Sequence, residues 1–180
     1  MRRMLAGSML IAALPLAMSA DAATSAAKRL ILRAEGLSIV GPGLKTPLRA
    51  SFGVPRAEAI KFVASMRGPA TRSGTIEDCG SGTPMGYANF KGGLELSFLD
   101  GKFVGWTLSS PTDGTLRTMK DITIGSSRPA FKTAYPTATI EESTLGTEYG
   151  SDDAGSGLFD DAKPGARISN MWAGQTCIAR

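Results

Sequence analysis

The chain has 180 residues, with 20 Lys and Arg, 16 Asp and Glu, and no His. The absence of His excludes Ser-His-Asp and Cys-His catalysis and His-ligated zinc, and it removes the commonest general base at neutral pH. The formal net charge of +4 is too small by itself to predict binding to nucleic acid.

The N-terminus has the three-part pattern of a secretory signal peptide. Two arginines precede an uncharged apolar stretch from Leu5 to Ala17, and Ala20-Asp21-Ala22 places small residues where a signal peptidase cuts. The apolar stretch is too short for a membrane span, and no cysteine near the cleavage site could carry a lipid. We therefore expect residues 1–22 to be removed and residues 23–180 to form a single α+β domain, periplasmic or secreted, with no membrane anchor.

The first half of the mature chain predicts strands, one helix and a hairpin. Short apolar runs at 30–32 and 37–40 predict strands, and the alternating segments 94–98 and 103–108 flank a hairpin turn at Asp100-Gly101. Between them, Pro55 suits the first turn of a helix that Gly68-Pro69 ends. The apolar residues of that helix recur at i, i+3, i+4 and i+7, and so share one face: Ala59, Phe62, Val63 and Met66.

The second half predicts similar elements. Ile122–Ile124 is expected to end a strand, and a short helix follows, capped by Ser126 or Ser127 and ended by Pro136. A hairpin is expected from Phe159 to Trp172. The polar segment 71–83 has no strand pattern and predicts a loop.

The two halves match at several positions, which favours an internal duplication. Gly53 and Gly125 lie 72 residues apart, as do Arg56 and Arg128, and each half ends in a hairpin that carries one Trp. Chance similarity between two α+β segments is the alternative. The predicted fold is an antiparallel sheet packed with two short helices, built from tandem halves at about 28–110 and 115–180.

An apolar residue, a Gly, two residues and an Arg before an amphipathic helix, followed by a hairpin, resemble a group of small secreted bacterial proteins. The layout is similar to the halves of β-lactamase inhibitory protein and to the small lipoprotein of the outer-membrane assembly machine. The resemblance rests on Phe52–Ala59, Ile124–Phe131 and the hairpins. It implies a fold of this kind and a function in binding proteins, although this chain lacks the lipid-acceptor Cys and has one cysteine in each half.

The mature chain has two cysteines, Cys79 and Cys177. An even count in an oxidising compartment favours a disulfide between them, which would close a loop of 98 residues. A redox-active pair is the alternative, but it normally requires a C-x-x-C spacing.

Charge is unevenly distributed along the chain. Nine basic residues fall between Lys28 and Arg72, and seven acidic residues with no basic one fall between Thr137 and Ala162. Two solvated surfaces would explain this, and so would separate faces for an anionic and a cationic partner. Asp152, Asp153, Asp160 and Asp161 could offer oxygen ligands to calcium, but their spacing also fits a solvated loop.

The chain contains no specific catalytic motif, so we expect no catalytic residues, no cofactor and no metal site. Trp106 and Trp172 are expected to anchor the hairpins in the core rather than to stack on a ligand. The sequence therefore predicts a non-enzymatic, inhibitor-like or protein-binding module whose partner is another envelope or secreted protein, not a nucleic acid. A hydrolase that uses Asp and Glu carboxylates and a structural envelope protein are the alternatives.

Overall fold

The computed structural model describes residues 27–79 and 83–178. The expected signal peptide, residues 1–22, lies outside the described residues. Two helices, α1 (Arg56–Arg67) and α2 (Arg128–Ala134), accompany mostly antiparallel strands, which confirms the predicted α+β class. Within the described ranges, no helix is long and apolar enough to cross a bilayer.

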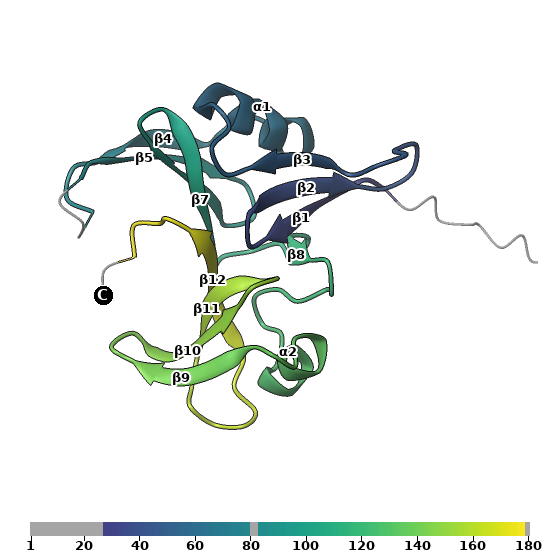
Figure 1. The fold of residues 1–180 in the computed structure, drawn as a ribbon, viewed down its shortest axis with the longest axis vertical. Helices are drawn as coiled ribbons and strands as arrows, with labels where there is room; N and C mark the ends of the chain where they lie inside the picture. Colours follow the sequence, from purple (N-terminus) through teal and green to yellow (C-terminus); the bar gives the residue numbers. More distant parts are fainter. Residues whose placement is uncertain (1–26, 80–82, 179–180) are drawn as a thin grey trace, which may run out of the picture.

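Eight strands form one long antiparallel sheet whose two halves meet at its centre (Figure 1). The first half follows α1 and comprises β4 (Arg72–Ile76), β5 (Met85–Phe90), β6 (Leu94–Leu99) and β7 (Lys102–Ser109). The second half follows α2 and comprises β9 (Thr139–Ser143), β10 (Gly146–Ser151), β11 (Gly155–Phe159) and β12 (Ile168–Gly174). Because β7 pairs with β12, the last strand of each half lies at the centre and the first at an outer edge.

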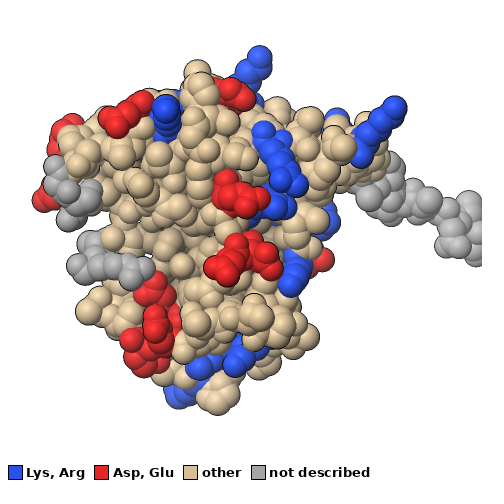
Figure 2. Space-filling view, viewed as in Figure 1, with Lys and Arg blue, Asp and Glu red and all other residues tan. Residues whose placement is uncertain are grey.

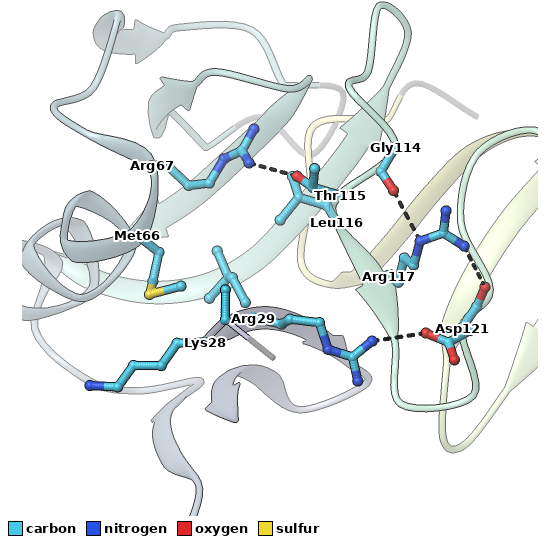
Figure 3. Close-up of a pocket in the computed structure, with 11 residues that line it drawn as sticks. Lys28, Arg29, Met66, Arg67, Gly114, Thr115, Leu116, Arg117 and Asp121 are labelled. Carbon is cyan, nitrogen blue, oxygen red and sulfur yellow. Dashed lines mark hydrogen bonds and ion pairs between the residues drawn. The ribbon is translucent and has the colours of Figure 1, made fainter. Parts of the chain in front are cut away.

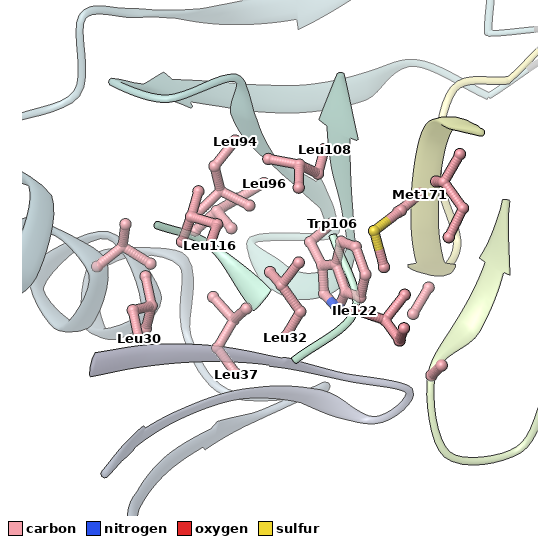
Figure 4. Close-up of a cluster of buried hydrophobic side chains, with 14 of the residues drawn as sticks. Leu30, Leu32, Leu37, Leu94, Leu96, Trp106, Leu108, Leu116, Ile122 and Met171 are labelled. Carbon is pink, nitrogen blue, oxygen red and sulfur yellow. The ribbon is translucent and has the colours of Figure 1, made fainter. Parts of the chain in front are cut away.

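A second, smaller sheet packs against one face of the long sheet. It consists of β1 (Arg29–Arg33), β2 (Gly36–Val40), β3 (Leu48–Ser51) and the two-residue β8 (Arg117–Thr118), which pairs parallel to β1. Figure 4 shows the apolar side chains of β1 and β2 directed toward those of β6 and β7. The contact is built from Leu30, Leu32, Leu37, Leu94, Leu96 and Trp106, all buried.

The two helices complete the core on the same face. In α1, Ala59 and Val63 are fully buried, while Phe62 and Met66 are half-buried and pack against the core, so the predicted apolar face is correct. In α2, the Ser127 side chain accepts a hydrogen bond from the backbone N–H of Ala130, which confirms one of the two expected caps. That helix buries Phe131 in a cluster with three other rings, those of Tyr135, Tyr149 and Phe159.

The junctions before the two helices make the same contacts. The N–H of Gly53 donates to the carbonyl of Phe103, and the N–H of Gly125 donates to the carbonyl of Ile168, at 2.7 and 2.8 Å. Both glycines have positive φ angles, 95° and 84°, which side chains disfavour. Three residues further on, the guanidinium carbons of Arg56 and Arg128 lie 4.9 and 5.8 Å from the ring centroids of Phe98 and Phe159, respectively. The matched Gly and Arg positions therefore occupy equivalent structural positions.

Several elements differ from the sequence-based expectation. The segment 71–83 was expected to be a loop, but it contains the edge strand β4, and β3, β9 and β10 were not predicted. Edge and polar strands expose both faces in part, so their alternation is weak. The expected strand end at Ile122–Ile124 is wrong, because these residues are irregular and fill the core through Ile122.

The two tryptophans do not occupy equivalent positions. Because Phe103 corresponds to Ile168 at the junctions, the residue that corresponds to Trp106 is Met171, not Trp172. Trp106 is fully buried in the core and donates from Nε1 to the Arg33 carbonyl at 2.8 Å. Trp172 pairs with Thr107 across the sheet and lies on the opposite face. Both tryptophans are therefore buried, as expected, but Trp106 belongs to the main core cluster and Trp172 lies outside it.

Cys79 and Cys177 form the predicted disulfide, with their Cα atoms 5.2 Å apart. Cys79 follows the edge strand β4 of the first half, and Cys177 follows the central strand β12 of the second. The bridge therefore ties the end of the chain to the outer part of the sheet.

Candidate binding face

One face of the long sheet packs on the core, and among the described residues no helix covers the other. We call this second face the open face. The strand register places polar and apolar side chains alternately, so residues next to core positions such as Leu94, Leu96 and Leu108 belong to it. Its central members are Tyr87, Asn89, Glu95, Ser97, Thr107, Ser109, Glu148, Gly150, Ser156, Leu158, Asn170 and Trp172.

The chain's own C-terminal segment crosses part of the open face. The N–H of Gln175 donates to the carbonyl of Val104 at 2.8 Å, and a Cβ on Gly105 would lie 2.1 Å from the Gln175 carbonyl oxygen. Gly105 therefore gives the backbone room to run close over β7. The disulfide at Cys177 holds this segment toward the end of the sheet where Cys79 contacts Met85.

The centre of the face holds polar groups that lack partners. Glu95 lies between Asn89 on β5 and Thr107 on β7 and makes no hydrogen bond or ion pair with the described residues. It is half-buried, and this burial raises the pKa of its carboxyl group. Two residues along, the hydroxyl of Ser97 is buried without a hydrogen-bond partner in the same described ranges. Such groups lose hydration without compensation in the free protein.

A hollow of about 310 Å³ opens beside Glu95. Its walls include Asn89, Thr107 and Ser109 from the sheet and Pro111 from the loop after β7. Glu95 is the one charged side chain among the residues that line it. The hollow is therefore suited to a cationic or hydrogen-bond-donating group.

The outer part of the second half is acidic. Glu141 on β9 stands directly opposite Glu148 on β10, and Asp152 lines a second hollow of about 390 Å³ with Thr139 and Ser156. Figure 2 shows acidic side chains gathered over the hairpin formed by β9 and β10. At the other end of the sheet, the guanidinium carbon of Arg72 lies 5.8 Å from the ring centroid of Tyr87. Along its length, the open face is thus more acidic than basic.

The aspartates considered as calcium ligands are not brought together. Asp152 and Asp153 lie in the turn before β11, whereas Asp160 and Asp161 lie in the loop after it. Asp160 accepts a hydrogen bond from the Arg167 N–H, and Asp161 pairs with Lys163, which lowers the pKa of Asp161. In residues 27–79 and 83–178, no three Cys, Asp or Glu side chains gather as a metal site.

Comparison with protein-family models, with curated proteins and with solved structures gave no match.

The sequence alone predicted only part of the open face. The alternation of Leu94-Glu95-Leu96-Ser97-Phe98 indicated that Glu95 and Ser97 share a face. The contribution of Tyr87, Glu141 and Glu148 depends on strand pairings that no local pattern specifies.

Proposed function

We propose that the protein is exported through a cleaved signal peptide and acts as a non-enzymatic binding module of the cell envelope. Its contact surface is the open face, and its partner is a protein that presents a Lys or Arg side chain to Glu95. The half-buried carboxylate of Glu95, without a partner and beside a hollow, is the observation that carries the proposal. A cation placed there would compensate the lost hydration and lower the pKa of Glu95.

The charge of the face supports a protein partner rather than a nucleic acid. Glu95, Glu141 and Asp152 outnumber Arg72 on it, and phosphate groups would be repelled. The hydroxyl and amide side chains between them offer the mixed hydrogen bonding found at protein interfaces.

The carboxylate hydrolase receives less support from this geometry. Cleavage of a glycosidic bond by two carboxylates needs both of them to face one bound substrate. Each of the two hollows on the open face is lined by one carboxylate, Glu95 in one and Asp152 in the other. Asp160 and Asp161 line a hollow together, but Asp160 already accepts from the Arg167 N–H and Asp161 already pairs with Lys163. The structure offers no comparable argument for a purely structural envelope role.

We also propose that the two halves arose by duplication. The identical backbone contacts of Gly53 and Gly125, and the placement of Arg56 and Arg128 near an aromatic ring, support this origin. In this view the open face spans both halves, and the β7–β12 pairing makes it continuous.

A charge-reversal experiment tests the proposed contact. The mature protein, Glu95→Lys and the matched control Glu58→Lys would each be immobilised and exposed to the exporting cell's envelope fraction. Glu58 lies on α1, away from the open face. We expect one partner to bind the wild type and the control equally and to be lost with Glu95→Lys. Equal capture by all three proteins, or no capture, would contradict the proposal.

A further inference from the structure

A further cavity, apart from the two hollows of the open face, lies on the side of the molecule that carries the small sheet. It has a volume of about 470 Å³ and is enclosed by the start of β1, the end of α1 and the segment from Gly114 to Asp121 (Figure 3). This volume is within the range of small-molecule sites in proteins. None of its lining residues belongs to the open face.

The cavity exists because the strand beside β1 is short. β8 pairs only with Ile31 and Leu32, so in the described chain no strand lies beside Arg29 and Leu30 on that edge. The C-terminal end of α1 closes the space from the other side through Met66 (Figure 3).

The inner surface of the cavity is apolar. Leu30 and Leu116 are exposed by 4% and 1%, and they contribute to the hydrophobic core as well as to the cavity. Met66, from the last turn of α1, lines the cavity with them. A thioether adapts readily to the shape of an apolar ligand.

The rim of the cavity carries an excess of positive charge. Three cations, Lys28, Arg29 and Arg117, and one carboxylate, that of Asp121, line the rim, and Figure 3 shows Lys28 extending to the side opposite Arg29 and Arg117. Arg29 Nη1 donates to Asp121 Oδ1 at 3.1 Å, whereas Arg117 donates to the backbone oxygens of Gly114 and Asp121. Lys28 has no hydrogen bond or ion pair with any described residue. Two positive charges at the rim thus have no carboxylate to balance them.

A fourth cation, Arg67, also lines the cavity, but its charge is already balanced by the carboxylate of Asp113. It donates to the carboxylate of Asp113, to the hydroxyl of Thr115 and to the Lys91 carbonyl. Burial acts to raise the pKa of Asp113, but hydrogen bonds from Thr115 and Arg67 outweigh it and hold the pKa at about 2. The pair therefore stays ionised at neutral pH, and Arg67 does not add to the excess charge.

We propose that this cavity binds a single-chain anionic amphiphile, with its carboxylate at Arg29 and Arg117 and its alkyl chain against Leu30, Met66 and Leu116. Guanidinium groups recognise carboxylates through paired hydrogen bonds, and the buried apolar surface favours the chain. This site is separate from the protein contact proposed above and does not depend on it.

Calorimetric titration of the mature protein tests the proposal. Octanoate is expected to bind saturably at one site, while acetate, which lacks the chain, and 1-octanol, which lacks the charge, bind at least about tenfold more weakly. Equal binding of octanoate and 1-octanol, or no binding of octanoate, would overturn it.

Matched variants separate the cavity from general electrostatic attraction. Arg29→Gln with Arg117→Gln should weaken octanoate binding by about tenfold, the effect of losing two partly exposed charges near a carboxylate. Lys45→Gln with Arg49→Gln removes the same charge from exposed positions on the β2–β3 loop and β3, and should leave binding unchanged. Equal losses in both double variants would contradict the assigned site. Thermal melts would show that all variants fold.

The same chemistry occurs in anionic bilayers, so a vesicle arm distinguishes the source. Phosphatidylglycerol vesicles would be co-sedimented with the wild type and with Met66→Gln. In the calorimetric titration, we expect Met66→Gln to weaken octanoate binding, because an amide replaces the thioether in the apolar part of the cavity. Binding to vesicles without binding to monomeric octanoate would overturn the proposal of a cavity ligand.

Discussion

At the scale of single residues, the molecule contains buried polar groups whose hydration is not replaced. The Tyr149 hydroxyl is among them, because it is buried without a hydrogen-bond partner in the described structure, and burial raises its pKa. Its ring, by contrast, lies 4.2 Å from that of Phe131, centroid to centroid. The ring and the hydroxyl should therefore have opposite effects on stability.

Replacing Tyr149 by Phe is expected to leave the free energy of unfolding unchanged or to raise it, because an unsatisfied buried hydroxyl is removed. Phe131→Ala is the matched contrast and should lower it by about 3–5 kcal/mol through loss of burial and creation of a cavity. Urea denaturation measures both. A loss above about 1 kcal/mol in Tyr149→Phe would reveal a hydrogen bond to this hydroxyl.

The raised pKa of Glu95 predicts the direction in which the stability of the protein changes with pH. This pKa is raised in the folded protein, so the folded state binds the proton of Glu95 more tightly than the unfolded state. Stability is therefore lost as the pH rises from about 4.5, the ordinary pKa of a glutamate, through the raised pKa of Glu95. Glu95→Gln should remove this loss and be more stable than the wild type at pH 7. Parallel pH profiles for the two proteins would contradict the assigned burial.

At the scale of elements, the helices and the central hairpins follow from local sequence. Pro55, the amphipathic face of α1 and Asp100-Gly101 are short-range signals, and the structure agrees with each of them. The edge strands β4 and β9 depend on pairing with β5 and β10, and their residues include exposed charges such as Arg72 and Glu141. A period of two requires one buried face, so sequence alone could not identify them.

The two helix junctions should respond alike to substitution. Gly53→Ala and Gly125→Ala place a side chain at a positive φ in otherwise open space, so each should cost about 1–2 kcal/mol. Gly165→Ala is the control, since Gly165 has equally open space without a positive φ. Thermal unfolding measures the three variants. A neutral result for one junction and not the other would show that the junctions are not equivalent.

At the scale of the whole molecule, one sheet joins the two halves, and one disulfide ties the β4 end of that sheet to the C-terminal segment. The sequence indicated the disulfide partners by count and compartment. It did not indicate that Trp172 lies on the open face, because a shift of one residue in register reverses the face of a strand. The long-range pairing of β7 with β12 decides that register.

Removing the bridge should lower stability without changing the fold. Cys79→Ser with Cys177→Ser opens a loop with a sequence separation of 98, and about 2–4 kcal/mol should be lost. Denaturant titration of the oxidised wild type and the double variant measures this difference. Thiol titration of the denatured, unreduced wild type should find no free Cys, and two free thiols would contradict the bridge.

Binding through the open face is the central claim, and site-specific photo-crosslinking in the exporting cell tests it most directly. A photoreactive phenylalanine would replace Tyr87 on the open face or Lys61 on α1. The account predicts a crosslinked partner from position 87, lost when Glu95→Lys is added, and none from position 61. A crosslink from position 61 alone, or one from position 87 that survives Glu95→Lys, would contradict it.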